Sequence, residues 1–236
     1  MRCLARGRIW RRDGPGSGAP PVKWAIPRWL QWPEWRATVP EDRRPLAGLL
    51  SGFVAIDLET TGLDPRRDAI VSVAVVPFRD GEPAGGYETL VNPGRPIPPA
   101  STRIHAITDE MVAAAPRLDE VLDTIEAVCG HDVIVGHGVA FDLAILERER
   151  RAHRRAPLPN TALCTMRLAG ALHPGGADVT LEALAARLGV PVVGRHTARG
   201  DALIAGSMML GLLPELARRG HRTLADAVWL QRSVVL

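Results

Sequence analysis

Short apolar runs separated by turn residues open the region that begins near Phe53. The runs at 53–59, 69–78 and 86–93 are bounded by Asp, Gly and Pro, which is typical of strands joined by tight turns. Because little chain separates them, we expect these strands to be antiparallel neighbours. Another apolar run, 132–138, follows a long helical segment, as expected of a strand that a crossover returns parallel to the same sheet.

Apolar residues at helical spacing fill the intervals between and after these strands. The spacing predicts helices from 108 and from 117, then near 140–152, 161–172, 180–188 and 198–219, with a last one from about 223. Strands that alternate with helices indicate the α/β class, with a mixed central sheet flanked by helices.

The first 45 residues show neither period. Prolines at 20, 21, 27, 33, 40 and 45 exclude a long helix, and five of the six tryptophans lie here: Trp10, Trp24, Trp29, Trp32 and Trp35. Two interpretations stay open. The tryptophans could stack on nucleic-acid bases while arginines meet phosphates, or they could pack on the domain or a partner. We therefore divide the chain into a basic Trp/Pro-rich arm, 1–45, and a domain, 46–236.

Charge divides the chain at the same point. Residues 1–45 contain ten basic and four acidic side chains, a net charge of +6, whereas residues 46–236 contain 19 basic and 22 acidic ones, a net charge of -3. The basic character of the whole chain is therefore a property of the arm.

The bulk composition is that of a soluble globular protein. Hydrophobic residues make up 46% and charged residues 23%, and no apolar run approaches the ~18 residues of a membrane span. Cys3, Cys129 and Cys164 show no disulfide or zinc spacing, and the Arg-rich opening lacks the apolar core of a secretory signal. We expect a cytoplasmic protein without a membrane partner.

Two carboxylates stand where a buried strand alone would not place them. In FVAIDLETTG, only Leu58 separates Asp57 from Glu59, and residues two apart on a strand share one face, about 6 to 7 Å apart. Carboxylates are depleted in strands and costly to bury unless they are paired or bind a cation. The pair alone leaves a structural and a functional interpretation equally open.

Two further motifs place polar residues at the starts of helices. GHGVAFD puts Asp142 in a first helical turn, and RHTARGD puts His196 just before a helix and Asp201 at its start. Each alone is what the helix dipole or the surface would favour. Together with Asp57 and Glu59, however, they would bring four carboxylates to the carboxyl edge of the sheet, where α/β proteins bind ligands.

This combination predicts a metal-dependent phosphodiesterase. Hard oxygen ligands prefer Mg²⁺ or Mn²⁺, and a formal charge of -4 requires more than one ion. Two ions about 4 Å apart can hold the attacking and leaving oxygens of a phosphodiester. A histidine of near-neutral pKa beside them suits deprotonation of the attacking water.

The motifs DLETTG, HGVAFD and HTARGD, in this order and separation, resemble the three exonuclease motifs of the DEDDh 3′-5′ exonucleases. That family includes the DNA polymerase III epsilon subunit, RNase T and oligoribonuclease. Residues 92–116 are similar to the stretch that epsilon-type members carry between the first two motifs, and the resemblance covers about residues 52–215. It implies a ribonuclease H-like fold and 3′-5′ exonuclease activity that releases 5′-mononucleotides.

The resemblance also implies a role for each matching residue. The metal-binding acids are Asp57, Glu59, Asp142 and Asp201, with His196 as the general base. For the substrate, Thr60, Thr61 and Gly62 would form the turn whose backbone meets the 3′-terminal nucleotide, His105 and Ile107 would line its base and sugar, and Phe141 matches an aromatic position at which packing is favoured over chemistry.

Two positions depart from the pattern of the family. Gly138 stands where many relatives have Asn, and Ala106 stands where glycine is usual. Neither change removes a ligand or the base, so we expect activity to survive with an altered rate or substrate preference.

Three functional hypotheses remain. The leading one is a metal-dependent exonuclease that acts on 3′ ends of single-stranded or frayed DNA. The second keeps the chemistry and makes RNA or short oligonucleotides the substrate, because the contacts that sense a 2′-OH cannot be placed. The third is a catalytically weak nucleic-acid-binding module whose arm binds the partner.

A polymerase or a sliding clamp is the expected protein partner. The last six residues, QRSVVL, resemble a clamp-binding peptide, with a plain helix end as the alternative. A role in replication proofreading, in repair or in recycling of fragments is left open.

Overall fold

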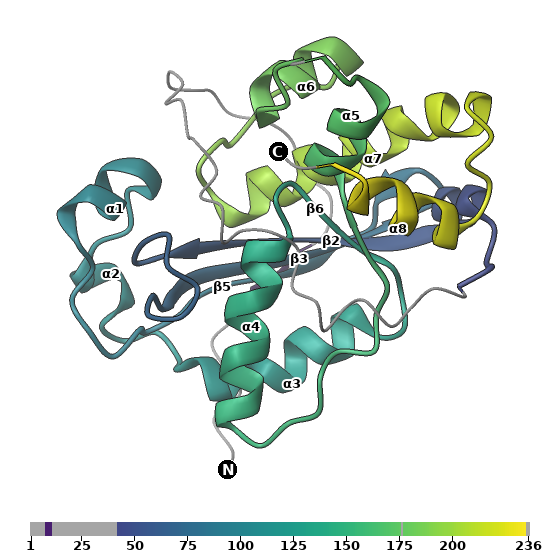
Figure 1. The fold of residues 1–236 in the computed structure, drawn as a ribbon. Helices are drawn as coiled ribbons and strands as arrows, with labels where there is room; N and C mark the ends of the chain where they lie inside the picture. The colour runs from purple at the N-terminus through teal and green to yellow at the C-terminus, as the bar shows by residue number, and fades with distance from the viewer. Residues whose placement is uncertain (1–7, 11–41, 176, 235–236) are drawn as a thin grey trace.

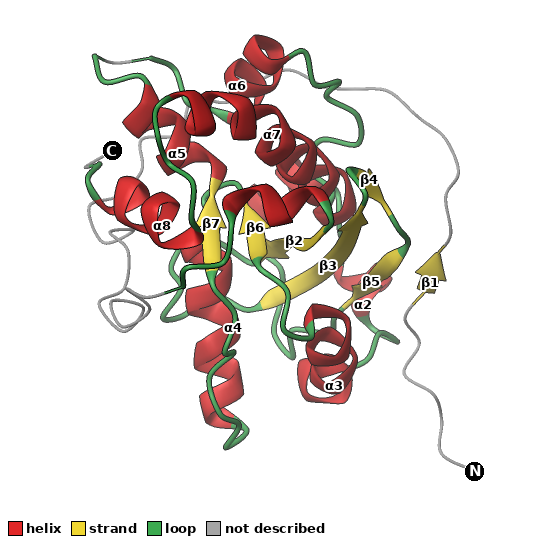
Figure 2. Ribbon diagram, turned by 90° about the vertical axis from the view of Figure 1, so that its right-hand side faces the viewer, coloured by secondary structure: helices red, strands yellow, loops and turns green. Residues whose placement is uncertain are grey.

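The computed structural model describes residues 8–10, as backbone only, together with 42–175 and 177–234 (Figure 1). Within these residues, helices cover both faces of a mixed 7-stranded sheet with the strand order β1-β5-β3-β2-β6-β7, to which β4 adds by pairing with β3 (Figure 2). The strands are β1 (Arg8–Trp10), β2 (Gly52–Thr60), β3 (Ile70–Arg79), β4 (Glu82–Pro83), β5 (Gly86–Leu90), β6 (Ile134–Gly136) and β7 (Ala162–Cys164).

The pairing of the strands confirms the predicted α/β topology. β3 is antiparallel to both β2 and β5, as expected of strands joined by short turns. β6 pairs with β2 in parallel after the crossover that contains α3, which also confirms the prediction. β2 thus lies inside the sheet, between β3 and β6.

The helices divide between the two faces of the sheet. α3 (Leu118–Cys129) and α4 (Ala140–Ala152) lie on one side, and α5 (Thr165–Leu172), α6 (Leu181–Leu188), α7 (Ala198–Arg218) and α8 (Leu224–Arg232) lie on the other (Figure 1). α1 (Pro99–His105) and α2 (Asp109–Val112) stand beyond one end of the central strands, and the 3₁₀-helix η3 (Leu46–Leu50) precedes β2.

Alternation along β2 builds both hydrophobic cores. Phe53 and Ala55 point into the core shared with α7, whereas Val54 and Ile56 point into the core shared with α3 and α4. Phe53 is fully buried, which contributes about 1.5 to 3 kcal/mol of hydrophobic free energy. The residues that follow on the α7 side of β2 are Asp57 and Glu59.

Three elements differ from the sequence prediction. α1 was not predicted, because seven residues are too few to show a helical period; its signal is Pro99 at the first helical position. The helix expected from 108 spans only Asp109–Val112. The segment 161–172, expected to be wholly helical, opens with the buried strand β7, which is also too short to show a period.

The arm contributes one strand to the sheet, although no strand was expected there. The backbone of Arg8–Trp10 pairs antiparallel with β5. Trp24, Trp29, Trp32 and Trp35 lie outside the described residues. At the end of the arm, the Ala225 N–H donates to the Asp42 carbonyl (2.9 Å), so the hydrogen-bond network of the domain extends back to Asp42.

Gln231, the first residue of the possible clamp-binding peptide, belongs to the folded domain. Gln231 is fully buried in α8, where its side chain accepts from the Cys164 N–H (2.8 Å) and donates to the Ala162 carbonyl (2.9 Å) of β7. Gln231 and Arg232 thus form the end of α8, as the helix-end alternative expects, while the sliding-clamp partner stays a prediction.

Two further sequence expectations can be compared with the described residues. Cys129 and Cys164 are buried free thiols, and Cys3 lies outside this part of the chain. Among the described helices, α7 alone has the length and hydropathy of a membrane span, but 61% of that window is buried inside the structure. It packs along β2 and β3 as the central helix of the domain.

Candidate active site

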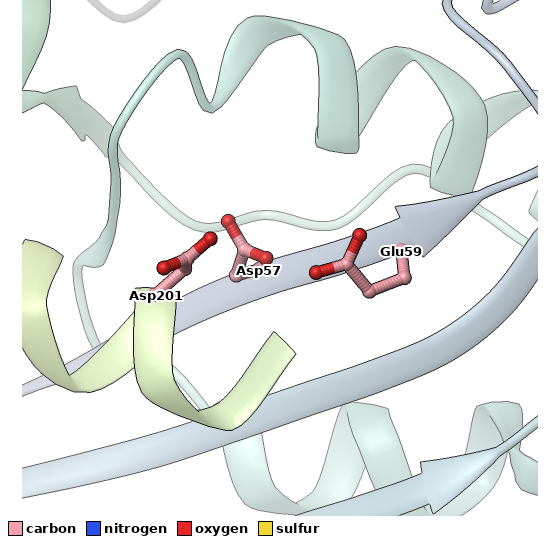
Figure 3. A group of neighbouring side chains, drawn as sticks. All are labelled: Asp57, Glu59 and Asp201. Atoms are coloured by element: carbon pink, nitrogen blue, oxygen red, sulfur yellow. The ribbon is translucent and has the colours of Figure 1, made fainter. Parts of the chain in front are cut away.

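Asp57 and Glu59 project from β2 on the side that α7 covers, as the two-residue spacing predicts (Figure 3). β3 pairs with β2 along its whole length, in a register that places Asp57 opposite Ala74 and Glu59 opposite Ser72. The register shifts directly after Glu59, where the strand ends in a turn. The two acids therefore close the α7-side core at the carboxyl end of a central strand.

A tight loop before α7 brings Asp201 to the same place. Thr197 caps the helix: its hydroxyl donates to the Gly194 carbonyl (2.6 Å) and accepts from the Gly200 N–H (3.0 Å). A Cβ on Gly200 would lie 1.9 Å from the Gly194 oxygen, so this approach requires a glycine. One turn into the helix, Asp201 faces Asp57 (Figure 3).

Replacing Gly200 by Ala is expected to destabilise the domain by at least about 2 kcal/mol, because a backbone atom cannot move aside as a side chain can. The same change should displace Asp201 and lower activity further than the loss of folded protein explains. Urea denaturation and the specific activity of the folded fraction measure the two effects. Gly48, whose added Cβ would meet nothing within 4 Å, is the matched control, and equal stabilities of the two alanine variants would contradict the prediction.

Ligand oxygens of Asp57, Glu59 and Asp201 lie within 4.8 Å of one another (Figure 3). The Oδ1 oxygen of Asp201 is buried and has no hydrogen-bond partner among the described residues. An unpaired buried carboxylate oxygen is costly, and a divalent cation would satisfy it. The three acids therefore fit a hard metal ion.

Asp142 joins the site from the opposite layer of the fold. It lies in the first turn of α4, and its Oδ1 accepts the Leu58 N–H (3.1 Å), which belongs to the residue between the two acids of β2. β6 pairs with β2 only as far as Ala55. The Asp142 side chain therefore satisfies the Leu58 N–H, which lies beyond the part of β2 that β6 covers. Asp142 is thus adjacent to the three-acid group without belonging to it.

Burial raises the pKa of all four carboxyls, and the charges of neighbouring carboxylates add to the rise. The pKa of Glu59 rises to about 8, that of Asp142 to about 7 and that of Asp201 to about 6, in each case chiefly through burial. Burial likewise raises the pKa of Asp57 well above its usual value, followed by the charges of Asp201, Asp142 and Glu59. Without a cation, Glu59 is therefore mostly protonated at pH 7, whereas Asp201 is mostly ionised.

These raised pKa values predict that the metal-free protein loses stability between pH 6.5 and 8.5. The folded chain holds protons there that the unfolded chain has already released, so rising pH favours unfolding, by roughly 2 kcal/mol for Glu59. The buried His137, whose pKa is lowered to about 4, acts in the opposite sense mainly below this window, as do His105 and His196, whose pKa values are also lowered. Thermal unfolding with EDTA measures the effect.

Glu59→Gln is the matched variant for this pH dependence, because it keeps the shape and removes the titrating group. Its Tm should fall less between pH 6.5 and 8.5 and should exceed that of the wild-type protein at pH 8.5. A wild-type Tm that rises over this range in EDTA would contradict the assignment.

Two charged residues that sequence analysis missed flank the acids. Arg195 donates from Nη1 to Asp201 Oδ2 and from Nε to Glu182 Oε1 (2.6 Å). Glu182 lies in the first turn of α6, 13 residues earlier in the chain, so no local spacing links it to the motif. Arg195 precedes His196 directly, and its place in RHTARGD is the one signal that could have drawn attention to it.

His196 lies beside Asp201 in a strained backbone conformation. Its φ of 63° is in the left-handed region, and its N–H donates to Asp201 Oδ2 (3.3 Å). Burial, followed by the positive charge of Arg195, lowers the pKa of the imidazole. The lowered pKa favours the neutral imidazole at pH 7, the form that a general base requires.

Comparison with known proteins agrees with this geometry. Residues 54–209 match the RNase T family, described as exonucleases. The chain belongs to this exonuclease family. The resemblance inferred from the three motifs, the enzyme class at the level of the family, and the ribonuclease H-like α/β fold are thereby confirmed.

Two sequence relatives and one solved structure illustrate the similarity to other exonucleases. A DNA polymerase III subunit epsilon-like protein of Rhodobacter capsulatus is 41% identical over 72% of this chain, which spans only 25% of that protein. The DNA polymerase III subunit epsilon of Aquifex aeolicus is 32% identical over 75% of this chain and 88% of its own length. Exonuclease X in complex with 5′ overhanging duplex DNA superposes with a TM-score of 0.60 and 28% identity, over 76% of this chain and 99% of the other.

The exonuclease turn predicted to meet the 3′-terminal nucleotide is tied into the domain. The Thr60 hydroxyl donates to the Gly62 carbonyl (2.7 Å), and a Cβ on Gly62 would lie 2.5 Å from the Asp68 carboxylate. The Thr61 N–H donates to the Ala69 carbonyl (2.9 Å), and the Thr61 carbonyl accepts from the Ser101 hydroxyl (2.8 Å). A backbone contact to substrate through Thr61 would therefore require these bonds to change, and the substrate role of the turn stays a prediction.

His105 and Ile107, which are predicted to line the terminal base and sugar, lie at the end of α1. Ile107 is buried in a small cluster with Val71 and Ile97, and its N–H donates to His105 Nδ1 (3.0 Å). Between them, Ala106 adopts a φ of 58°, a conformation that glycine reaches without steric cost. Ala106 thus keeps the turn that the usual glycine would form, and the substrate roles of His105 and Ile107 stay predictions.

The departure at Gly138 has a similar explanation. Gly138 has a φ of 80°, in the left-handed region where Asn is the best tolerated side chain, and an added Cβ would meet only Met166, at 3.9 Å. The exonuclease backbone therefore accepts either residue. Phe141 is half-buried against the α3 and α4 core, consistent with packing, while its predicted contact with substrate remains untested.

Proposed function

We propose that this chain is a metal-dependent 3′-5′ exonuclease that hydrolyses the terminal phosphodiester of DNA. The observation that carries the proposal is the group formed by Asp57, Glu59 and Asp201, with oxygens within 4.8 Å, in a domain of the exonuclease family. Asp142 contacts the same strand from the other layer. Burying four acids at one edge is costly, and a bound cation would offset that cost.

The proposed cofactor is a pair of Mg²⁺ or Mn²⁺ ions. Asp57, Glu59 and Asp201 would hold them, with Asp142 as the fourth ligand once its carboxylate serves the metal as well as the Leu58 N–H. When bound, the ions neutralise the phosphate and lower the pKa of the attacking water. The unpaired Asp201 Oδ1 and the raised carboxyl pKa values support a cation at this place.

The residues of the chain would supply the remaining chemistry. His196 is neutral at pH 7 and would accept the proton of the attacking water. Asp142 fixes the backbone between the two acids of β2, so that both side chains stay on one face. His196 and Asp201 lie on one short segment that begins at Gly194, which would set the base beside the acids.

DNA is the substrate that the relatives favour. Both sequence relatives bear the name of a DNA polymerase III subunit, and the structural relative was solved with duplex DNA that carries a 5′ overhang. Such a duplex presents a recessed 3′ end. We infer a DNA 3′ end as substrate and a polymerase as the first partner to test.

The direct test uses three 5′-labelled oligonucleotides of one sequence: single-stranded DNA, DNA with a recessed 3′ end, and RNA. We expect a ladder of shortened 5′-labelled DNA products with Mg²⁺, none with EDTA, and slower trimming of RNA. Release of the 5′ label first would contradict the 3′-5′ polarity. Equal or faster cleavage of RNA would instead support the exoribonuclease alternative.

A further inference from the structure

Arg195 joins the acid group to an acid outside it. Its Nη1 donates to Asp201 and its Nε donates to Glu182 (2.6 Å), while only 18% of its side chain is exposed, against 34% for Glu182 and 6% for Asp201. The guanidinium is a rigid fork with five donors, so one arginine can hold both acids at once. The outer end of this bridge is thus the more solvent-exposed one.

Nη1 of Arg195, the nitrogen that contacts Asp201, also lies 3.3 Å from His196 Nδ1. Because a guanidinium can only donate, Nδ1 must be the acceptor, and the hydrogen of the neutral imidazole is assigned to Nε2. In this arrangement Nε2 of His196 carries a hydrogen and cannot accept one from water. Arg195 therefore contacts both Asp201 and His196, the proposed base.

A divalent ion that bound both oxygens of Asp201 would compete with this guanidinium for Oδ2. Arg195 Nη1 and the His196 N–H already occupy Asp201 Oδ2, which leaves only Oδ1 unpaired. An ion that also took Oδ2 would stand in direct contact with the positive guanidinium. Two cations in contact at a half-buried site repel strongly, so Arg195 and the ion cannot share Oδ2.

We propose that Arg195 is a resident counter-ion that occupies Asp201 in the metal-free protein and yields it to a divalent metal, while Glu182 retains its Nε. This inference rests on the proposed metal-dependent function. Its consequence is that departure of Nη1 also releases His196 Nδ1. The imidazole can then carry its hydrogen on Nδ1 and accept a proton at Nε2, so that binding of metal prepares the base.

The test is the affinity for Mn²⁺ alone, measured by calorimetry on the full chain without substrate at 0.05 M and 0.5 M KCl. We expect Arg195→Gln to bind Mn²⁺ at least ten-fold more tightly than wild type at both salt concentrations, because direct competition persists where long-range charge effects are screened. Its metal-free Tm should fall by several degrees and recover with saturating Mn²⁺. Wild-type or weaker affinity of the variant at 0.5 M KCl overturns the proposal.

Arg148→Gln is the matched control. Arg148 is also a partly buried arginine, but it donates to the carbonyls of Pro65 (2.7 Å) and Asp68 (2.6 Å) and to no member of the acid group. Its Mn²⁺ affinity should stay within about three-fold of wild type at 0.5 M KCl. The same tightening in both variants would show a general charge effect and overturn the specific competition.

Two further measurements cover failure of the main variant. If Arg195→Gln does not fold, arginine Nε–H spectra of the wild-type chain titrated with Mg²⁺ give the answer: the Arg195 signal must shift while the Arg148 signal does not, and an unchanged Arg195 signal overturns the proposal. Wild-type protein that binds no Mn²⁺ overturns the proposed function together with this inference, whereas tight wild-type binding without a gain in Arg195→Gln overturns this inference alone.

Discussion

Asp57→Asn is expected to lower the rate of nucleotide release by about 10³-fold or more, with little change in the fold. Asp57 is part of the acid group, and a neutral amide would withdraw one anionic ligand from the proposed cation, which would supply several kcal/mol of transition-state stabilisation. The amide is isosteric, so the strand should keep its register. Single-turnover cleavage of a 5′-labelled oligonucleotide in Mg²⁺ measures the loss.

The Asp57 variant also has an expected stability. Because burial and three neighbouring carboxylates raise the pKa of Asp57, removal of its charge should increase the metal-free Tm at pH 8. Asp119→Asn, an exposed carboxylate on α3, is the control that should change neither property. Turnover within ten-fold of wild type in Asp57→Asn would remove Asp57 from the mechanism.

His196→Ala is expected to lower kcat by about 10² to 10⁴-fold, the usual contribution of a general base, while metal and strand still bind. The change removes a proton acceptor and no carboxylate. Affinity for Mn²⁺, and for a phosphorothioate oligonucleotide by fluorescence anisotropy, should remain within about three-fold of wild type. Loss of both binding and turnover would assign His196 a structural role instead.

The backbone of His196 calls for a second variant. At a φ of 63°, Asn is the side chain best suited to replace His, because it tolerates the left-handed region and has no basic nitrogen. His196→Asn should therefore lose as much kcat as His196→Ala while retaining more stability. Activity that returns in the Asn variant would mean that backbone conformation, rather than the imidazole, limits the reaction.

The acids of this site could be found in the sequence because each obeys a local rule. Period-two alternation puts Asp57 and Glu59 on one face of β2, and the motifs place Asp142 and Asp201 in the first turns of α4 and α7. Convergence of the four was an inference from sheet topology. The structure adds that Asp142 comes from the opposite layer and contacts backbone, a distinction that spacing alone does not carry.

The features that sequence analysis missed depend on contacts between distant segments. The Arg195–Glu182 pair joins α6 to the loop before α7, and neither residue has a pattern that announces its partner. β7 and α1 are too short to show a period, and tertiary packing decides their conformation. Gln231 resembled part of a peptide signal but is buried against β7, because backbone groups of that short strand need a partner.

The bond from the Leu58 N–H to Asp142 gives the protein a built-in spectroscopic probe. This single amide lies between Asp57 and Glu59 in the chain and donates to Asp142. Its hydrogen-exchange rate therefore depends on the placement of all three acids. Slow exchange at Leu58 would report an assembled acid group without substrate or turnover. One backbone resonance could thus rank variants, metals and solution conditions by how completely each one organises the catalytic edge of the sheet.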